Sequence, residues 1–136
     1  MSNVATEALT VVAEREIPFP PEKIWRALTQ PHLIEEWLMK NDFKPVVGHG
    51  FNLRADWGVV DCQVQAVEPN KTLSYTWGAY GLESVVTWTL TPTKTGTRLR
   101  MEQSGFRPDQ EQAYRGARAG WRHFLAALER VLTRTD

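Results

Sequence analysis

The sequence predicts an α+β fold, in which one antiparallel sheet of about six or seven strands wraps on a long C-terminal helix. Three observations predict it. Apolar residues recur at helical spacing over residues 108–133. Between residues 42 and 105 they recur at every second position, with no helical pattern in between. Two short helical patterns follow the first strand, over residues 21–39.

The first elements are a strand and these two short helices. Apolar and polar residues alternate over residues 9–17, and the prolines that follow end the strand because they cannot donate to a ladder. A helix is predicted from Pro21, with Trp25 on its apolar side. The residue before a proline disfavours helical backbone, so Pro31 ends this helix and begins the second, which carries Trp37.

The middle of the chain is predicted to be a meander of strands. Glycine, proline and asparagine turn signals divide the alternating region, and none of the connections is long enough to hold a helix. The predicted strands cover residues 43–47, 51–57, 59–67, 72–77, 86–91 and 97–103.

The long helix has an uneven apolar stripe. Small residues fill its first half and bulky residues its second half, and Phe124 and Leu128 are predicted to be fully buried. Gly116 and Gly120 lie inside the helix, although each costs roughly 1 kcal/mol relative to alanine. They indicate either close packing of the helix on the sheet or a cavity beneath it. The stripe consists of Ala113, Ala117, Gly120, Phe124, Leu128 and Val131.

Composition excludes several classes of function. The 16 basic and 16 acidic residues give a net charge of zero, so no basic block is present to bind nucleic acid. The single Cys62 excludes an internal disulfide and favours a reducing compartment. There is no signal peptide pattern and no apolar run long enough for a membrane span. We therefore expect one cytoplasmic domain over residues 1–136.

The sequence contains no assembled catalytic or metal motif. The lone cysteine and the three histidines lack metal-ligand spacing, so no metal or other cofactor is expected. Cys62 falls in the middle of a strand, where a buried inert thiol is typical. No catalytic residue is assigned. His49 is the best-placed titrating group, in a turn at a sheet end, although turn histidines are usually solvated.

The aromatic residues favour an apolar pocket beneath the small-residue half of the helix, with plain core packing as the alternative. Gln103 has the inward parity of its strand, so its amide must find a protein partner, a water or a ligand there. The candidate ligand-binding residues are Trp25, Trp37, Tyr75, Trp77, Trp88, Gln103, Tyr114, Ala117, Gly120 and Trp121.

Several local motifs follow the same order as the predicted elements. They are FPPEKIWRALTQP at 19–31, VEPNKTL at 67–73, VTWTL at 86–90, GTRL at 96–99 and the closing Gly120-Trp121. As a set they resemble the START-like (SRPBCC) superfamily, and within it the branch named after the activator of a heat-shock chaperone's ATPase. The resemblance spans nearly the whole chain and implies the helix-grip fold.

The chain departs from that family pattern at two places. Members often carry a histidine where this chain has Gln103, and a Gly-Gly turn where it has Gly48-His49. A role that depends on a histidine at position 103 is therefore not expected here.

The leading interpretation is a non-catalytic protein that binds a small lipophilic or aromatic molecule in an apolar pocket between the sheet and the C-terminal helix. Whether the chain is a monomer or a homodimer is left open. The resemblance implies two alternatives. One is an enzyme of the cyclase, aromatase or dehydratase kind, using His49, Tyr75, Tyr114 or Gln103 on a polyketide-like substrate. The other is a chaperone cofactor in the stress response. The chaperone activator carries an additional N-terminal domain for which this chain is expected to have no room, so little ATPase stimulation is expected.

Overall fold

The computed structural model describes residues 9–135. Its order of elements confirms the predicted α+β fold, with short helices after the first strand and a long helix at the end. The elements are β1 (Leu9–Ile17), α1 (Pro21–Thr29), α2 (Pro31–Trp37), β2 (Lys40–Asn41), β3 (Gly50–Ala55), β4 (Gly58–Glu68), β5 (Thr72–Ala79), β6 (Leu82–Pro92), β7 (Thr97–Phe106), the 3-10 turn η1 (Pro108–Gln110) and α3 (Glu111–Arg134).

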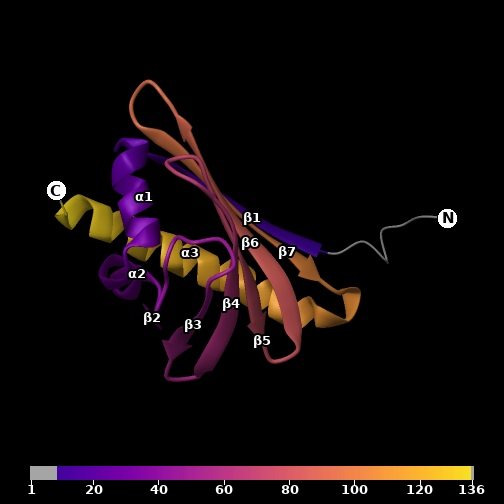
Figure 1. Ribbon diagram of the computed structural model, residues 1–136. Coiled ribbons are helices and arrows are strands. Elements are labelled where there is room, and N and C mark those ends of the chain that lie inside the picture. The colour runs from indigo at the N-terminus through magenta and orange to yellow at the C-terminus, as the bar shows by residue number, and fades with distance from the viewer. Residues whose placement is uncertain (1–8, 136) are drawn as a thin grey trace.

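The seven strands found within the described residues form one antiparallel sheet in the order β1-β7-β6-β5-β4-β3-β2. Consecutive strands from β2 to β7 pair as a meander, and β1 returns to pair with β7 at the far edge (Figure 1). One face of this sheet carries the large apolar side chains and packs on α3.

The predicted strand over residues 43–47 is wrong. The strand before β3 covers only Lys40–Asn41, and residues 44–49 form a loop. Pro45 lacks a backbone donor for a ladder, and Gly48 has a φ of +90°. The backbone N–H of Gly48 donates instead to the carbonyl of Val64 on β4, over 2.8 Å.

The two halves of α3 have different surroundings. Figure 1 shows α1 and α2 gathered against its C-terminal (yellow) half, while its N-terminal (orange) half extends beyond them. No residue between 111 and 120 is fully buried. The buried residues of α3 all lie in the second part of the helix: Trp121, Leu125, Leu128, Val131 and Leu132.

Phe124 was predicted to be fully buried and is only partly buried, whereas Leu128 is fully buried as predicted. The core-facing side of α3 is centred on Trp121, Leu125 and Leu128, so the predicted stripe is rotated about the helix axis. Phe124 lies at the edge of the core-facing side, where it is partly exposed and contacts Trp121 at a centroid distance of 5.6 Å.

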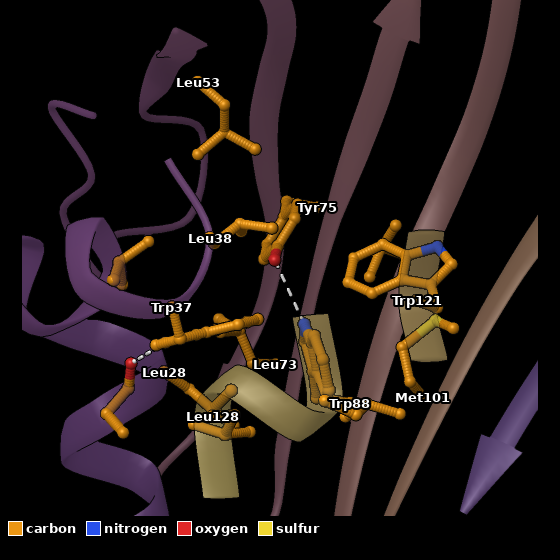
Figure 2. Close-up of a cluster of buried hydrophobic side chains, with 14 of the residues drawn as sticks. Leu28, Trp37, Leu38, Leu53, Leu73, Tyr75, Trp88, Met101, Trp121 and Leu128 are labelled. Atoms are coloured by element: carbon orange, nitrogen blue, oxygen red, sulfur yellow. Dashed lines mark hydrogen bonds between the residues drawn. The ribbon is translucent and has the colours of Figure 1, made fainter. Parts of the chain in front are cut away.

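Aromatic side chains fill the centre of the core (Figure 2). Trp88 is fully buried and makes edge-to-face contacts with Trp37 and Trp121, at centroid distances of 5.7 and 5.6 Å. Its indole Nε1 donates to the hydroxyl of Tyr75 over 3.0 Å, and that of Trp37 donates to the carbonyl of Ala27 over 2.8 Å. These polar atoms are therefore satisfied inside the protein, as buried tryptophan and tyrosine require.

Candidate ligand-binding cleft

A cleft of about 470 Å³ lies along one flank of the first half of α3, facing the turn end of β5 and β6. Five aromatic residues and five small residues make up most of its lining, and methionine, leucine and glutamine side chains complete it. The lining residues are Trp57, Trp77, Tyr80, Trp121 and Phe124; Ala79, Ala113, Gly116, Ala117 and Gly120; and Met39, Leu82, Gln103, Gln110 and Gln112.

The two glycines inside α3 keep this flank open. A Cβ built on Gly116 would meet no heavy atom within 4 Å, and one built on Gly120 would meet only the ring of Phe124, at 3.9 Å. A side chain would therefore have room at either position, which is not expected where a helix packs closely on a sheet. Of the two interpretations left open by the sequence, the structure therefore supports the cavity.

A directional hydrogen-bond chain starts at Trp121 and Gln103 in the lining of the cleft and continues into the sheet. The indole Nε1 of Trp121 donates to Oε1 of Gln103 over 2.7 Å, and Nε2 of Gln103 donates to Oγ of Ser84 over 2.9 Å. Ser84 in turn donates to the backbone carbonyl of Trp77 over 2.9 Å. Because an indole nitrogen can only donate, it fixes which end of the amide faces the helix. Gln103 is only 1% exposed and links α3 to β6 and β7.

Two hairpin tips form the mouth of the cleft. Tyr80, in the β5–β6 turn, has a φ of +52° and is 80% exposed, and its hydroxyl donates to the carbonyl of Trp57 in the β3–β4 turn over 2.5 Å. Gly58 has a φ of +152°, and a side chain there would collide with the Tyr80 hydroxyl. Gln110 Nε2 donates to the carbonyl of Gly81 over 3.3 Å, which joins the start of α3 to the same tip.

Half of the ten residues predicted from the sequence line this cleft. They come from β5, β7 and α3: Trp77, Gln103, Ala117, Gly120 and Trp121.

The structure places the other five predicted residues elsewhere. Trp37, Tyr75 and Trp88 form the core beneath the second half of α3. Trp25 is partly buried on α1, and Tyr114 packs edge-to-face on the ring of Phe106 at a centroid distance of 5.7 Å. The inward parity of the strands was right for Tyr75 and Trp88, but α2 and the second half of α3 cover that end of the sheet.

Sequence reasoning missed the residues that the turns contribute. The predicted strand over residues 51–57 puts Trp57 on its apolar side and Tyr80 falls in a predicted loop, and neither residue is in the predicted site. A bulky aromatic residue beside a turn glycine, as in Trp57-Gly58 and Tyr80-Gly81, was the available signal. The other lining residues absent from the predicted set are Met39, Ala79, Leu82, Gln110, Gln112, Ala113, Gly116 and Phe124.

The family described as "Activator of Hsp90 ATPase homolog 1-like protein" matches residues 18–133. The chain belongs to this family. The START-like superfamily resemblance seen in the sequence is thereby confirmed. A search of curated proteins gave no significant match.

Several solved structures have a fold similar to that of this chain. Protein MLL2253 from Mesorhizobium loti is 70% identical, with 94% of this chain and 99% of that chain covered and a TM-score of 0.92. DynU16, a putative protein in the dynemicin biosynthetic locus, is 30% identical over 91% of this chain, with a TM-score of 0.82. The match covers only 47% of DynU16. The Aha1 dimer from Colwellia psychrerythraea is 22% identical, covers 91% of this chain and 96% of that chain, and has a TM-score of 0.83, which shows the fold alone.

His49, Asp42 and Cys62 lie outside the lining of the cleft. His49 makes a 2.9 Å contact from Nε2 to the carbonyl of Asp42, and its ring stacks on Phe51. A backbone hydrogen bond from Asn52 lowers the pKa of Asp42. Burial raises the pKa of the Cys62 thiol to about 12, consistent with an inert thiol.

Across residues 9–135, no group of three or more His, Cys, Asp or Glu side chains is placed to hold a metal ion. None of the described helices is both long and apolar enough to cross a membrane. A second hollow of about 810 Å³ surrounds the β5–β6 hairpin, but it is more open and has polar side chains such as Asp61, Glu83 and Ser104 in its lining.

Proposed function

We propose that this chain binds a small lipophilic or aromatic molecule in the cleft between α3 and the sheet, without turning it over. One observation carries the proposal: Gly116 and Gly120 of α3 line a cleft, and a side chain added at either position would have room. Each glycine weakens the helix by roughly 1 kcal/mol relative to alanine, and neither is required by a close approach of a side-chain position to the sheet. A volume of 470 Å³ is within the range of small-molecule pockets, roughly 300–1,000 Å³.

The polar groups of the cleft support binding over turnover. Among the described residues that line it, Tyr80 is the only one with an ionisable side chain. Of the four polar residues that the enzyme alternative offers as candidates, only Gln103 lines the cleft, and each end of its amide makes a hydrogen bond within the protein. Acid–base catalysis needs a titrating group in contact with the substrate.

An enzyme of the cyclase, aromatase or dehydratase kind is the second candidate. It is favoured by the 30% identity to DynU16, a putative protein in a biosynthetic locus. Sustained turnover of a polyketide-like substrate by the purified protein would establish this candidate in place of the first.

We further propose a cytoplasmic homodimer. The Colwellia psychrerythraea relative is a dimer, and the described chain holds its single cysteine as a buried free thiol, which suits a reducing compartment. Light scattering after size-exclusion chromatography tests the assembly directly: a monomer mass at micromolar concentration would contradict it.

Native mass spectrometry of freshly purified protein tests the binding function. We expect a co-purifying small molecule in the parent protein and its loss in Gly120→Leu, which fills the cleft. Ala119→Leu is the matched control, because Ala119 is exposed on the same helix and is not part of the lining. A parent protein that shows neither a bound molecule nor uptake of a neutral apolar dye would contradict the proposal.

A further inference from the structure

We infer that the cleft selects an uncharged ring compound with a carbonyl or hydroxyl group and excludes ionised molecules. This inference rests on the proposed function, and it adds the chemical class of the ligand. It is carried by the charge of the lining and by the kind of polar group that the lining contains.

The lining carries no formal charge. None of the fifteen described residues that form it is Asp, Glu, Lys, Arg or His. Charged residues make up 24% of the chain, so several would be expected in a set of that size taken at random. A site for a carboxylate, phosphate or amine would be expected to hold a counter-charge, because burying an unpaired ion costs far more than burying a hydrogen-bonded neutral group.

Charged residues are close by, but they pair with one another outside the cleft. Glu111 and Arg115 form an ion pair of 3.0 Å on the exposed side of α3. Arg107 and Asp109 form another, of 3.1 Å, just before that helix. The neutral lining is therefore a property of the cleft itself, since the segment that leads into α3 is rich in charge.

Three carboxamides lie in the lining, beside the Tyr80 hydroxyl and the N–H groups of three indoles, and all of these groups are neutral. Gln103 lies on β7, and Gln110 and Gln112 lie at the start of α3. A carboxamide has two amide hydrogens and an oxygen with two lone pairs. Gln103 donates one hydrogen to Ser84 and accepts one from Trp121, so one amide hydrogen and one oxygen lone pair remain beyond these two bonds. Such a group can match a neutral carbonyl or hydroxyl, and it cannot neutralise an ion.

The aromatic wall accounts for the preference for a ring. The indole of Trp121 lies 5.2 Å from that of Trp77 and 5.6 Å from the ring of Phe124, measured between centroids, and all three side chains line the cleft. Flat rings gain from offset or edge-to-face contacts at such distances beyond the area they bury.

Two fluorescent probes with the same ring system test the inference. N-phenylnaphthylamine is neutral, and anilinonaphthalene sulfonate adds a permanent negative charge to it. We expect the neutral probe to bind at least about tenfold more tightly in fluorescence titrations, because the sulfonate must give up its hydration. Nile red, which is neutral and larger, controls for the bulk of the sulfonate and should also bind.

A charge placed in the lining should change this selectivity. We expect Gln112→Lys to reduce the difference in affinity between the neutral and the anionic probe, because the lysine ammonium supplies a counter-charge to the sulfonate. Ala119→Lys adds the same charge on the exposed side of α3, outside the lining, and should leave the difference unchanged.

The possible failures are distinguishable. If the anionic probe binds as tightly as the neutral one, and the Gly120→Leu variant binds neither, the inference that the cleft excludes ionised molecules is overturned while the binding function stands. If Ala119→Lys changes the selectivity as much as Gln112→Lys, the discrimination lies outside the cleft and the inference is again overturned. If no probe binds at all, the proposed function fails and the inference fails with it.

Discussion

Trp121 on α3 and Gln103 on β7 are joined by a 2.7 Å hydrogen bond from the indole Nε1 to the amide oxygen. Both side chains are almost fully buried, and both line the cleft. This bond is thus a buried polar tie between the long helix and the sheet, at the level where the core ends and the cleft begins. Its loss should affect both stability and binding.

Replacing Gln103 with leucine should destabilise the fold. Leucine is similar in size, but it offers no acceptor to Trp121 Nε1, and a buried donor without a partner costs about 1–3 kcal/mol. We expect the free energy of unfolding, measured by urea denaturation, to fall by about that amount. A double-mutant cycle with Trp121→Phe isolates the contact, and strict additivity of the two changes would contradict the role assigned to the bond.

Gly120→Leu should raise the melting temperature and abolish the uptake of Nile red. Leucine gains up to roughly 0.8–1 kcal/mol in helix propensity, and a side chain that fills the cleft buries apolar area worth roughly 1.5–3 kcal/mol. In a close-packed interface the same change would cost about 1–3 kcal/mol. The sign of the change in melting temperature therefore distinguishes a cavity from a close-packed interface. The control substitution Ala119→Leu should keep dye binding. A clear drop in melting temperature would contradict the cavity.

Gly96 is the contrasting glycine, at the β6–β7 turn. A Cβ there would collide with the backbone carbonyl of Ile17 and would lie 2.8 Å from the backbone nitrogen of Phe19. We expect Gly96→Ala to lower the melting temperature, whereas Gly120→Ala should raise or preserve it. Equal effects of the two substitutions would show that helix propensity and space around the Cβ do not govern these sites.

The fold was predictable because its signals extend over long segments. Alternation along β4 to β7 fixed which side chains face α3, and it placed Trp77 and Gln103 correctly. The strand over residues 43–47 failed because Pro45 and Gly48 act locally against a short apolar pattern. The prediction that Phe124 is fully buried was wrong because helical spacing gives an apolar stripe but does not show which edge of that stripe the sheet covers.

The mouth of the cleft was beyond the reach of the sequence. Periodicity assigns faces to strands and helices, but it does not say which turns meet. Trp57 and Tyr80 come together because β3–β4 and β5–β6 end on the same side of a twisted sheet, and because a tyrosine hydroxyl reaches a carbonyl across 23 residues. Tertiary geometry of this kind depends on the whole sheet.

The stability of this chain should fall between pH 9 and pH 12. Burial raises the pKa of Cys62 from 9.0 to about 12, so above pH 9 the unfolded chain loses a proton that the folded chain keeps. Ionisation then favours the unfolded state as pH rises through this window. Burial raises the pKa of Tyr75 as well, which adds to the loss above pH 10.

Urea denaturation across that pH range measures the effect of Cys62. We expect Cys62→Ala to reduce the decline between pH 9 and pH 10, before Tyr75 contributes, whatever its effect on stability at pH 7. An identical decline in the variant would contradict a buried, protonated thiol. Alkylation of the parent protein at pH 8 should be slow until denaturant is added.

Tyr80→Phe should speed ligand exit with little loss of stability. The substitution removes the hydroxyl that donates to the Trp57 carbonyl and leaves the ring in place. Because Tyr80 is 80% exposed, the free energy of unfolding should change by less than about 0.5 kcal/mol. The two hairpin tips are then no longer tied across the mouth, so the dissociation rate of Nile red in stopped-flow experiments should rise.

Tyr114→Phe is the matched control, because Tyr114 lies outside the lining and its substitution should leave that rate unchanged. Equal dissociation rates in the parent protein and Tyr80→Phe would show that the ligand leaves by another route.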